Sequence, residues 1–578
     1  MTDRYPPCIE PTVINGLKIL SSSASSLTCY RGHPRDSFQI LEWDIDRDNM
    51  LSRSMTRAAT GGSAIAILRP LNFLATALPR LKPPQLHCRS RTHWQHVRPF
   101  SAGHSSAKET IRKCPMTSSG LPKLTLLEKI APPAYVRIIY PFALPENYDI
   151  NEISHVIRTA HAATNRRIPH MASIVGPTME DGVLTPELQH RQEGDPEDLV
   201  INDLRSPGAF PMTFKELQER HFPIDTLDPE KLCKYNNIWF PPTERHPASF
   251  VQANLIQGGM LLLWKFNHIA MDGTSLAIWM QVFAEECRRV QGIPISEPIQ
   301  LEEMYGSREL VMKGSSEGSS HIEDSPSFQL WPSSKPPPSQ ILEPDWSVAV
   351  YYLSKSSQKA LKALASPLNA TLKTEQSWIS TNDAIAALMW RVSIQVQGLP
   401  TSTEEQSEIC FAVDGRRKLD MEIHATEMGC FLQPASALAP LGKVYDESLT
   451  LADLALLVRQ AVTSALYKTS LQNLLAAAQK LRDEGQKYSM VYSALPKIPK
   501  SGVMLTSWSE WNVRDYDWGP LLGKIQGVRV PNTGYLNGTH IVFPRLPDGG
   551  VELFFCLPKD QIKALEKNDL LKRYAHRR

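Results

Sequence analysis

The chain has 578 residues, more than one hydrophobic core usually serves, so its length predicts two domains with additional segments. Hydrophobic residues make up 42% and charged residues 21%, as in soluble globular proteins. The formal net charge is only +2, with no basic stripe, and this argues against a nucleic-acid-binding protein.

The cysteines and the apolar runs restrict the compartment. The nine cysteines form no C-x-x-C pair, and no secretory leader precedes them, so we expect reduced thiols inside a cell. No apolar run approaches the roughly 20 residues that cross a bilayer. The sequence therefore predicts a cytoplasmic protein without a membrane span.

The first 115 residues differ from the rest in composition. No Asp or Glu occurs from Leu51 to Ala107, where seven arginines recur among Ala, Ser and Leu. This composition is typical of an organellar transit peptide, although fifty residues precede it. The alternative is a disordered extension, or upstream sequence joined before a natural start at Met116. Both interpretations place residues 1–115 outside the functional fold. Only the transit-peptide interpretation favours a mitochondrial location.

Strand and helix patterns begin after this segment. YVRIIYPFAL (135–144) alternates and is rich in β-branched and aromatic residues, which predicts a strand, and INEISHVIRTAHAATNR (150–166) has helical spacing. GGMLLLWKF (258–266) predicts a buried strand. GTSLAIWMQVFAEECRRV (273–290) predicts a helix that begins with a Ser or Thr cap.

A Ser- and Pro-rich stretch then separates two α/β domains. Residues 314–345 contain a triple proline and predict an extended linker between a domain over 116–313 and another over 346–578. The second domain is expected to contain strands at 346–354, 409–415 and 549–558 and helices at 381–396 and 451–468. We expect the cap of helix 381–396 at Thr381 or Asn382.

The segment NHIAMDG, at the turn between the buried strand and the next helix, contains the candidate chemistry. A His at this position is held rigidly, and its usual pKa near 6.5 leaves the imidazole able to accept a proton. The residues alone leave two alternatives open: His268 as a packed residue and Asp272-Gly273 as a plain turn. No third ligand lies nearby, so no metal site is predicted.

Several spaced motifs together point to a family. HIAMDG, STNDAIAALMW, VDGRRKL, LTSW and YDWGPLLGKIQGVRVP, in this order, resemble the BAHD family of CoA-dependent acyltransferases, particularly its fungal branch near the trichothecene acetyltransferases. The resemblance covers roughly residues 120 to 570. It implies an α/β, two-domain, chloramphenicol-acetyltransferase-like fold with mixed sheets and a channel between the domains.

The resemblance also implies a reaction. His268 would be the general base that deprotonates a hydroxyl or amine of a small secondary metabolite. The resulting nucleophile would attack the thioester of an acyl-CoA co-substrate, most simply acetyl-CoA, with no bound cofactor and no metal. It further implies a monomer whose partners are the acyl-CoA donor and the small acceptor.

Other site residues follow from the resemblance. Asp272 would pair with Arg416, or with Arg417 as second choice, and shape the turn beside Gly273. The C-terminal D-F-G-W-G signature is altered here. We read it as Asp517-Trp518-Gly519, with a register starting at Asp515 as the alternative. The possible channel residues are Thr506, Ser507 and Trp508.

Two rival classes share the fold. Condensation domains of peptide synthetases carry H-H-x-x-x-D-G and use a carrier-bound donor, but the first His position here is Asn267. A non-catalytic member of the same fold is the second rival. The altered C-terminal signature favours it, and the intact HIAMDG opposes it.

Overall fold

The computed structural model describes residues 120–578, apart from eight short gaps, together with five strands before residue 120. The gaps are 242, 303, 313–314, 333–344, 399–404, 418–422, 486–487 and 533–537. The five strands form one antiparallel sheet inside the unit Met1–Ala107. They are β1 (Thr12–Ile14), β2 (Leu17–Ser23), β3 (Ser26–Arg31), β4 (Gln39–Asp44) and β5 (Ser52–Met55). The rest of residues 1–115 lies outside the described residues, and its transit-like or disordered character stays a prediction.

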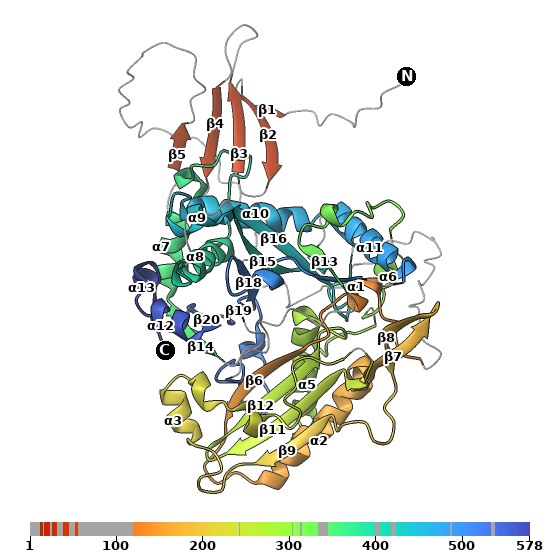
Figure 1. Ribbon diagram of the computed structural model, residues 1–578. Coiled ribbons are helices and arrows are strands. Elements are labelled where there is room, and N and C mark those ends of the chain that lie inside the picture. The colour runs from red at the N-terminus through yellow and green to blue at the C-terminus, as the bar shows by residue number, and fades with distance from the viewer. Residues whose placement is uncertain are drawn as a thin grey trace. The chain divides into compact units, whose positions relative to one another are not determined.

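Residues Lys108–Arg578 form a second compact unit with two α/β halves (Figure 1). The N-terminal half contains a mixed sheet in the order β6-β12-β11-β9 and a three-stranded sheet in the order β10-β7-β8. The strands are β6 (Tyr135–Ala143), β7 (Ile174–Glu180), β8 (Val183–Gln189), β9 (Leu199–Asp203), β10 (His246–Pro247), β11 (Ser249–Ile256) and β12 (Gly259–Asn267). The predicted strands at 135–144 and 258–266 are confirmed.

Two long helices pack on one face of the mixed sheet. They are α2 (Ile150–Arg167) and α5 (Gly273–Val290), which confirm the predicted helices at 150–166 and 273–290. Trp264 of β12 stacks on Trp279 of α5, with ring centroids 4.0 Å apart, in the core between them. The short helices are α1 (Leu126–Lys129), α3 (Phe214–Glu219), α4 (Pro229–Leu232) and α6 (Glu309–Met312).

The C-terminal half is built on a seven-stranded sheet in the order β16-β15-β18-β19-β20-β14-β21. These strands are β14 (Trp346–Leu353), β15 (Gln406–Asp414), β16 (Leu432–Pro440), β18 (Gly502–Ser507), β19 (Thr539–Val542), β20 (Val551–Pro558) and β21 (Ala575–Arg577). The helices of this half are α7 (Lys355–Leu364), α8 (Thr381–Val396), α9 (Leu441–Tyr445), α10 (Leu451–Ala465), α11 (Lys468–Asp483), α12 (Lys559–Leu565) and α13 (Asp569–Tyr574). The strands and helices predicted for this half are thus present.

The cap of α8 differs from the prediction by one residue. Ser380, rather than Thr381 or Asn382, accepts from the Asp383 N–H, while the Asp383 carboxylate accepts from the Ser380 N–H. This reciprocal capping box satisfies two backbone donors that the first turn would otherwise leave free.

Part of the predicted linker is folded. Within 314–345, β13 (Phe328–Pro332) pairs with β17 (Tyr488–Tyr492), and Phe328 is buried against α1 and α11. The apolar alternation of FQLW overrides the Ser- and Pro-rich composition around it. Residues 333–344 lie outside the described residues.

A returning segment joins the two halves. Residues 525–530 of the C-terminal half run beside β6, with bridges from Ile525 to Phe142 and from Arg529 to Ile139. Arg529 also forms a buried bidentate ion pair with Glu552 of β20, at 2.7 and 2.8 Å. One hydrophobic core therefore includes residues from both halves. None of the described helices is long and apolar enough to cross a bilayer.

Three buried histidines make the fold sensitive to acid. Burial lowers the pKa of His540 and of His170 to about 3 and that of His161 to about 4. The unfolded chain takes up these protons near the usual pKa of 6.5, whereas the folded chain does not. As the pH falls below 6.5, the unfolded state therefore binds more protons than the folded state. The contribution of these histidines to stability is complete above pH 6.5 and is lost on acidification.

We expect the free energy of unfolding, measured by urea denaturation, to decrease between pH 6 and pH 5. In His540→Gln this pH slope should be smaller by about 1 kcal/mol per pH unit, because one proton uptake is removed. His155→Gln changes an exposed histidine and should keep the original slope. An unchanged slope in His540→Gln would contradict this account of His540.

Candidate active site

His268 stands at the turn between β12 and α5. Its backbone N–H donates to the Ala134 carbonyl at 2.9 Å, and the Asn267 side chain accepts from the Ile269 N–H at 3.0 Å. The preceding strand is buried along its whole length, so the turn starts from a rigid position. These contacts fix the backbone on either side of His268, which lines a cavity.

The cavity beside His268 measures about 60 Å³ and is lined from both halves of the unit. From the N-terminal half come Ala134 and Tyr135, and from the C-terminal half come residues of β15, β16, β17, β18 and β19. Its full lining is Pro132, Ala134, Tyr135, His268, Cys410, Phe411, Ala412, Leu432, Pro434, Tyr492, Met504, Leu505, Thr506 and Thr539. The arrangement places an imidazole between two structural halves.

The surroundings of His268 keep its ring uncharged. Burial lowers the pKa of His268, and this outweighs the opposite effects of its own backbone carbonyl, of Asp272 and of the Met271 carbonyl. The Cys430 thiol lies at 3.6 Å from Nδ1. A neutral imidazole at pH 7 can accept a proton from a substrate.

Asp272 faces away from this chemistry. It is the N-cap of α5, in place of the predicted Ser or Thr, and its Oδ1 accepts from the Ser275 N–H at 3.0 Å. Its Oδ2 accepts from the Phe431 N–H at 2.8 Å and from Arg416 Nη1 at 2.7 Å. Arg416 Nη2 reaches Oδ1 at 3.2 Å. The carboxylate is thus committed to the turn and to Arg416.

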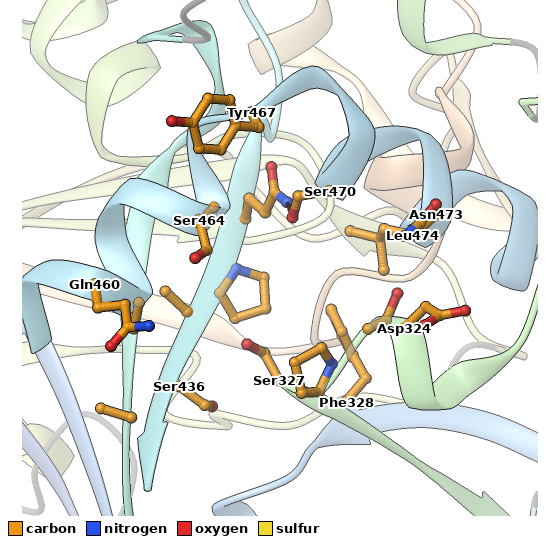
Figure 2. A pocket seen from close by; sticks show the side chains of 18 of the residues that line it. Asp324, Ser327, Phe328, Ser436, Gln460, Ser464, Tyr467, Ser470, Asn473 and Leu474 are labelled. Carbon is orange, nitrogen blue, oxygen red and sulfur yellow. Dashed lines mark hydrogen bonds between the residues drawn. The ribbon is translucent and has the colours of Figure 1, made fainter. Parts of the chain in front are cut away.

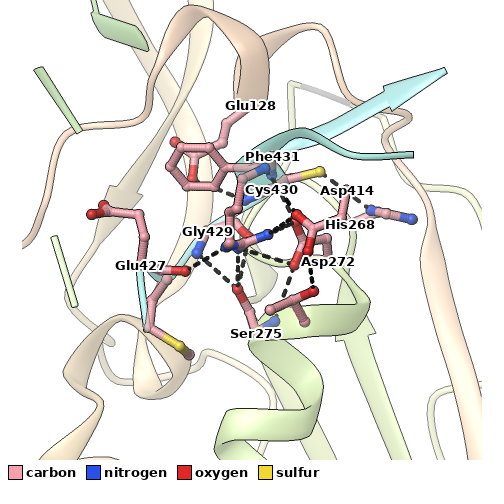
Figure 3. Close-up of polar contacts among 12 residues, drawn as sticks. Glu128, His268, Asp272, Ser275, Asp414, Glu427, Gly429, Cys430 and Phe431 are labelled. Carbon is pink, nitrogen blue, oxygen red and sulfur yellow. Dashed lines mark hydrogen bonds and ion pairs between the residues drawn. The ribbon is translucent and has the colours of Figure 1, made fainter. Parts of the chain in front are cut away.

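Arg416 is the cation of the same network, and Figure 3 shows the network around Asp272, Asp414 and Phe431. Besides Asp272, it donates to Asp414 at 3.0 Å and lies over the Phe431 ring at 4.6 Å. Burial alone would lower the pKa of Arg416, but Asp272 and Asp414 together raise it above its usual value. Arg417, the second candidate partner, is exposed.

Gly273 is required by close packing rather than by its backbone angles. A Cβ at this position would lie 2.2 Å from the ring of Trp511. The helix therefore starts directly against an aromatic side chain of the C-terminal half, which no larger residue would allow.

A second buried ion pair, Glu128–Arg308, contacts the segment next to the site, and the sequence did not indicate it. Glu128 accepts from Arg308 Nη2 at 2.8 Å through both oxygens, and Glu128 Oε1 also accepts from the Cys430 N–H at 3.2 Å. The segment 427–431 thus lies between Glu128–Arg308 and Asp272–Arg416. Its Gly429 carbonyl accepts from the Asp272 N–H and the Ser275 hydroxyl. Cys430 and Glu128 are 302 positions apart, so no local pattern could have indicated this contact.

The altered C-terminal motif lies against α5 and β6. Trp518 is fully buried and packs edge-on against Phe142 and Phe283, with centroids 5.1 and 5.3 Å away. Gly519 has φ +89°, a conformation that favours glycine, and its N–H donates to Asp517 Oδ1 at 3.0 Å. The Asp517-Trp518-Gly519 register stays a prediction. None of the three lines the cavity at His268.

The three possible channel residues are divided by the structure. Thr506 lines the cavity at His268. Ser507 instead donates to the Asn382 side chain at 2.8 Å, and Trp508 stacks on Trp511 with centroids 4.8 Å apart. Ser507 and Trp508 are not part of the cavity wall.

Thr539 also lines the cavity, although the sequence did not indicate it as a site residue. Its side chain is buried and lines the cavity, yet its Oγ1 has no hydrogen-bond partner among the described residues. A buried hydroxyl without a partner is costly, which makes a bound substrate its natural acceptor. Within the described part of the chain, no cluster of His, Cys, Asp and Glu could hold a metal ion.

Comparisons with known proteins identify the family. Residues 134–287 match the family described as trichothecene 3-O-acetyltransferase-like N-terminal domain, and residues 229–571 match the one described as transferase family. The chain belongs to this transferase family, which is of the BAHD type. It is an acyl-CoA-dependent acyltransferase, with CoA as co-substrate.

Two fungal proteins and a solved structure are similar to most of this chain. The chain is 26% identical over 459 residues to eremophilane O-acetyltransferase prx11 of Penicillium rubens, covering 74% of this chain and 92% of that protein. It is also 25% identical over 452 residues to a Penicillium crustosum protein named enoyl-CoA isomerase/hydratase claC. This match covers 78% of this chain and 50% of that protein. The crystal structure of F. graminearum TRI101 complexed with coenzyme A and T-2 mycotoxin matches with a TM-score of 0.66 at 20% identity, over 79% of this chain and 99% of that one. The predicted α/β fold is confirmed.

We expect loss of one member of the Asp272–Arg416 pair to destabilise the fold. Arg416→Met leaves a buried carboxylate without its cation, and the free energy of unfolding should fall by about 3 to 5 kcal/mol in urea titrations. Asp272→Asn combined with Arg416→Met removes both charges and should recover part of the loss. A single variant as stable as the parent would contradict this role.

Proposed function

We propose that the protein transfers an acetyl group from acetyl-CoA to a hydroxyl group of a small secondary metabolite, with His268 as general base. The observation that carries this proposal is a largely uncharged imidazole on the wall of a cavity shared by two halves of one chain. Because one chain supplies both walls, we further propose that it acts as a monomer.

The reaction requires a group that first accepts a proton from the attacking hydroxyl and then donates it to the leaving thiolate. Nε2 of His268 takes the proton of the acceptor hydroxyl as its oxygen attacks the thioester carbonyl. The tetrahedral intermediate then collapses, its carbon–sulfur bond breaks, and the CoA thiolate takes the proton from the imidazolium. General-base assistance of this kind contributes typically about 10²- to 10⁴-fold. No covalent acyl-enzyme is required.

The acetyl donor and the hydroxyl acceptor are inferred from the size of the cavity and from the names of similar proteins. A cavity of about 60 Å³ has room for a two-carbon acyl group. The relative prx11 is named an O-acetyltransferase, and F. graminearum TRI101 has been crystallised with coenzyme A and a mycotoxin. The first supports acetyl transfer to oxygen, and the second supports a CoA donor with a small-molecule acceptor.

The Thr539 hydroxyl is the candidate donor to the developing oxyanion. It is buried in the same cavity and has no protein acceptor among the described residues, so it can donate to the substrate without breaking an existing bond. Donors aimed at a transition-state oxyanion can each contribute about 100-fold or more to kcat. Asp272, Gly273 and Arg416 shape the turn that carries the base, and residues 517–519 attach the C-terminal half to α5.

His268→Ala should reduce kcat/KM for acetyl-CoA by at least about 100-fold, because the proton acceptor is lost. Thiol release from acetyl-CoA, followed with a panel of hydroxylated metabolites, measures this. His155→Ala, which changes an exposed histidine, serves as the control and should keep full activity. Unchanged turnover in a folded His268→Ala variant would rule out His268 as the base.

The pH dependence should report the same imidazole. Only the neutral ring accepts a proton, so kcat/KM should be constant at neutral pH and fall on acidification. Because burial lowers the pKa of His268, the midpoint should lie below 6.5. A midpoint well above 6.5 would contradict the uncharged resting state.

Thr539→Val keeps the shape of the side chain and removes only the hydroxyl. We expect kcat to fall about 100-fold while the midpoint of urea unfolding is unchanged or higher, because no protein hydrogen bond is lost. Thr164→Val removes a buried hydroxyl that donates to the Ala160 carbonyl at 2.8 Å and should keep kcat. Full activity in Thr539→Val would exclude the oxyanion role.

A further inference from the structure

The thiol of Cys430 contacts the ring of His268 without being part of the cavity wall. Its Sγ is 3.6 Å from Nδ1, and the residue is 2% exposed (Figure 3). His268 lines the cavity of about 60 Å³, whereas Cys430 does not. The Nδ1 edge of the imidazole therefore faces the protein, which leaves Nε2 as the ring nitrogen for a substrate.

The backbone around Cys430 is fixed on both sides. Its own N–H donates to Glu128 Oε1 at 3.2 Å, and the following N–H, that of Phe431, donates to Asp272 Oδ2 at 2.8 Å. The preceding residue, Gly429, has φ +134°, and a Cβ there would lie 2.1 Å from Glu128 Oε1. Two buried carboxylates thus determine where the sulfur lies.

The thiol of Cys430 is uncharged. Burial, together with the charges of Asp272 and Glu128, raises the pKa of Cys430 well above its usual value. Because the thiolate is the nucleophilic form, an uncharged thiol outside the cavity is not suited to attack an acyl-CoA thioester. Its sulfur can still accept a weak hydrogen bond. The contact with the imidazole is therefore the role that its position allows.

The surroundings of the His268 ring favour a hydrogen on Nδ1. The backbone carbonyls of His268 and of Met271 both raise the pKa of the ring, as acceptors of a ring N–H do. Only Nδ1, the ring nitrogen nearer to the main chain, can reach the carbonyl of its own residue. With its hydrogen on Nδ1, the neutral ring has its lone pair on Nε2, and the Cys430 sulfur is a further acceptor for the Nδ1–H.

A second cavity, of about 530 Å³, lies farther along the same chain segment (Figure 2). Residues 427–431 continue into β16, and Ser436 of this strand and Ser464 of α10 are among the residues that line the second cavity. Neither Cys430 nor His268 lines it. The contact between the thiol and the imidazole is therefore part of the packing around the base and not part of that cavity.

We infer that Cys430 is a positioning residue, whose sulfur accepts from Nδ1 of His268 and holds the ring with Nε2 toward the cavity. This inference rests on the proposed function for the role of His268 as base. It adds a residue of the C-terminal half to the groups that orient the base. Since the segment 427–431 is bound to Asp272 and Glu128, the orientation of the ring is linked to the contact between the halves.

Three substitutions at Cys430 separate the acceptor from the volume that it fills. Cys430→Val fills the site without an acceptor, Cys430→Ala removes the sulfur without adding atoms, and Cys430→Ser provides a stronger acceptor. Cys287→Val is the matched control, because Cys287 is a buried thiol of α5 that does not line the cavity at His268.

The first readout is the pKa of His268, measured by NMR on protein labelled with 15N in histidine, with His268→Ala to assign the signal. This measurement needs no substrate. An acceptor at Nδ1 stabilises the imidazolium, so the pKa should be lower in Cys430→Val than in the parent and higher in Cys430→Ser. Cys287→Val should leave it unchanged. One pKa shared by the parent, the valine variant and the serine variant would overturn the inference.

Other titratable groups near the ring are the same in all these variants. Asp272 is paired with Arg416. Tyr135, Tyr492 and Cys410 line the cavity. Burial raises the pKa of Tyr135 above its usual value and that of Cys410 to about 12, so both are uncharged at neutral pH. A change in the His268 titration can therefore be attributed to the substituted side chain.

The second readout is the division of the effect between kcat and KM in acetyl transfer. Cys430→Val and Cys430→Ala should lower kcat about tenfold or more, with the KM for acetyl-CoA within about twofold, because a misplaced catalytic group slows the chemical step. Cys430→Ser should restore kcat to within about threefold of the parent. Full kcat in both the valine and the alanine variants would overturn the inference, as would a serine variant no more active than the alanine variant.

The inference and the proposed function can fail separately. Turnover that requires His268 but is the same in all three Cys430 variants would leave the general base and remove the positioning residue. A pKa of His268 that follows the acceptor at position 430, together with full turnover in His268→Ala, would support the contact and remove the general base.

Discussion

The ion pair between Asp272 and Arg416 is the interaction on which the rest of the site depends. It joins the start of α5 in one half to the end of β15 in the other, and both side chains are buried. The segment 427–431 connects it to a second buried pair, Glu128–Arg308. Since Asp272 meets its cation only when both halves are in place, the position of His268 depends on the assembled unit rather than on its own turn.

The same constraint explains why the motif aspartate is not a partner of the base. Its carboxylate accepts hydrogen bonds from Ser275, Phe431 and Arg416. The pKa of the His268 imidazole is therefore set mainly by burial, which lowers it, while nearby backbone carbonyls and the charge of Asp272 act in the opposite direction. In the proposed reaction, Asp272 therefore has a structural role and His268 accepts the proton.

Much of the fold was predictable from local patterns. The long strands and helices followed from periodicity, because their buried faces repeat every two or about every 3.6 residues. The cap of α5 was misassigned because Asp272 was considered only for its charge, although it also caps the helix. Arg416 came from a family resemblance. Glu128, Arg308 and Thr539 could not be predicted, since their roles arise from contacts between residues far apart in the chain. The cavity of about 530 Å³ at the edge of β16 likewise depends on how α10 and α11 pack.

The return of residues 525–530 to β6 has a consequence for biosynthesis. The hydrophobic core around β6 and α5 includes Trp518, Leu522 and Ile525, which leave the ribosome long after β6 and α5 do. The N-terminal sheet must therefore wait, with part of its apolar surface uncovered, until residues 518–525 have been synthesised. Such a nascent chain exposes an aggregation-prone surface for longer than a protein whose domains close one after the other, and it has a correspondingly greater need for chaperones.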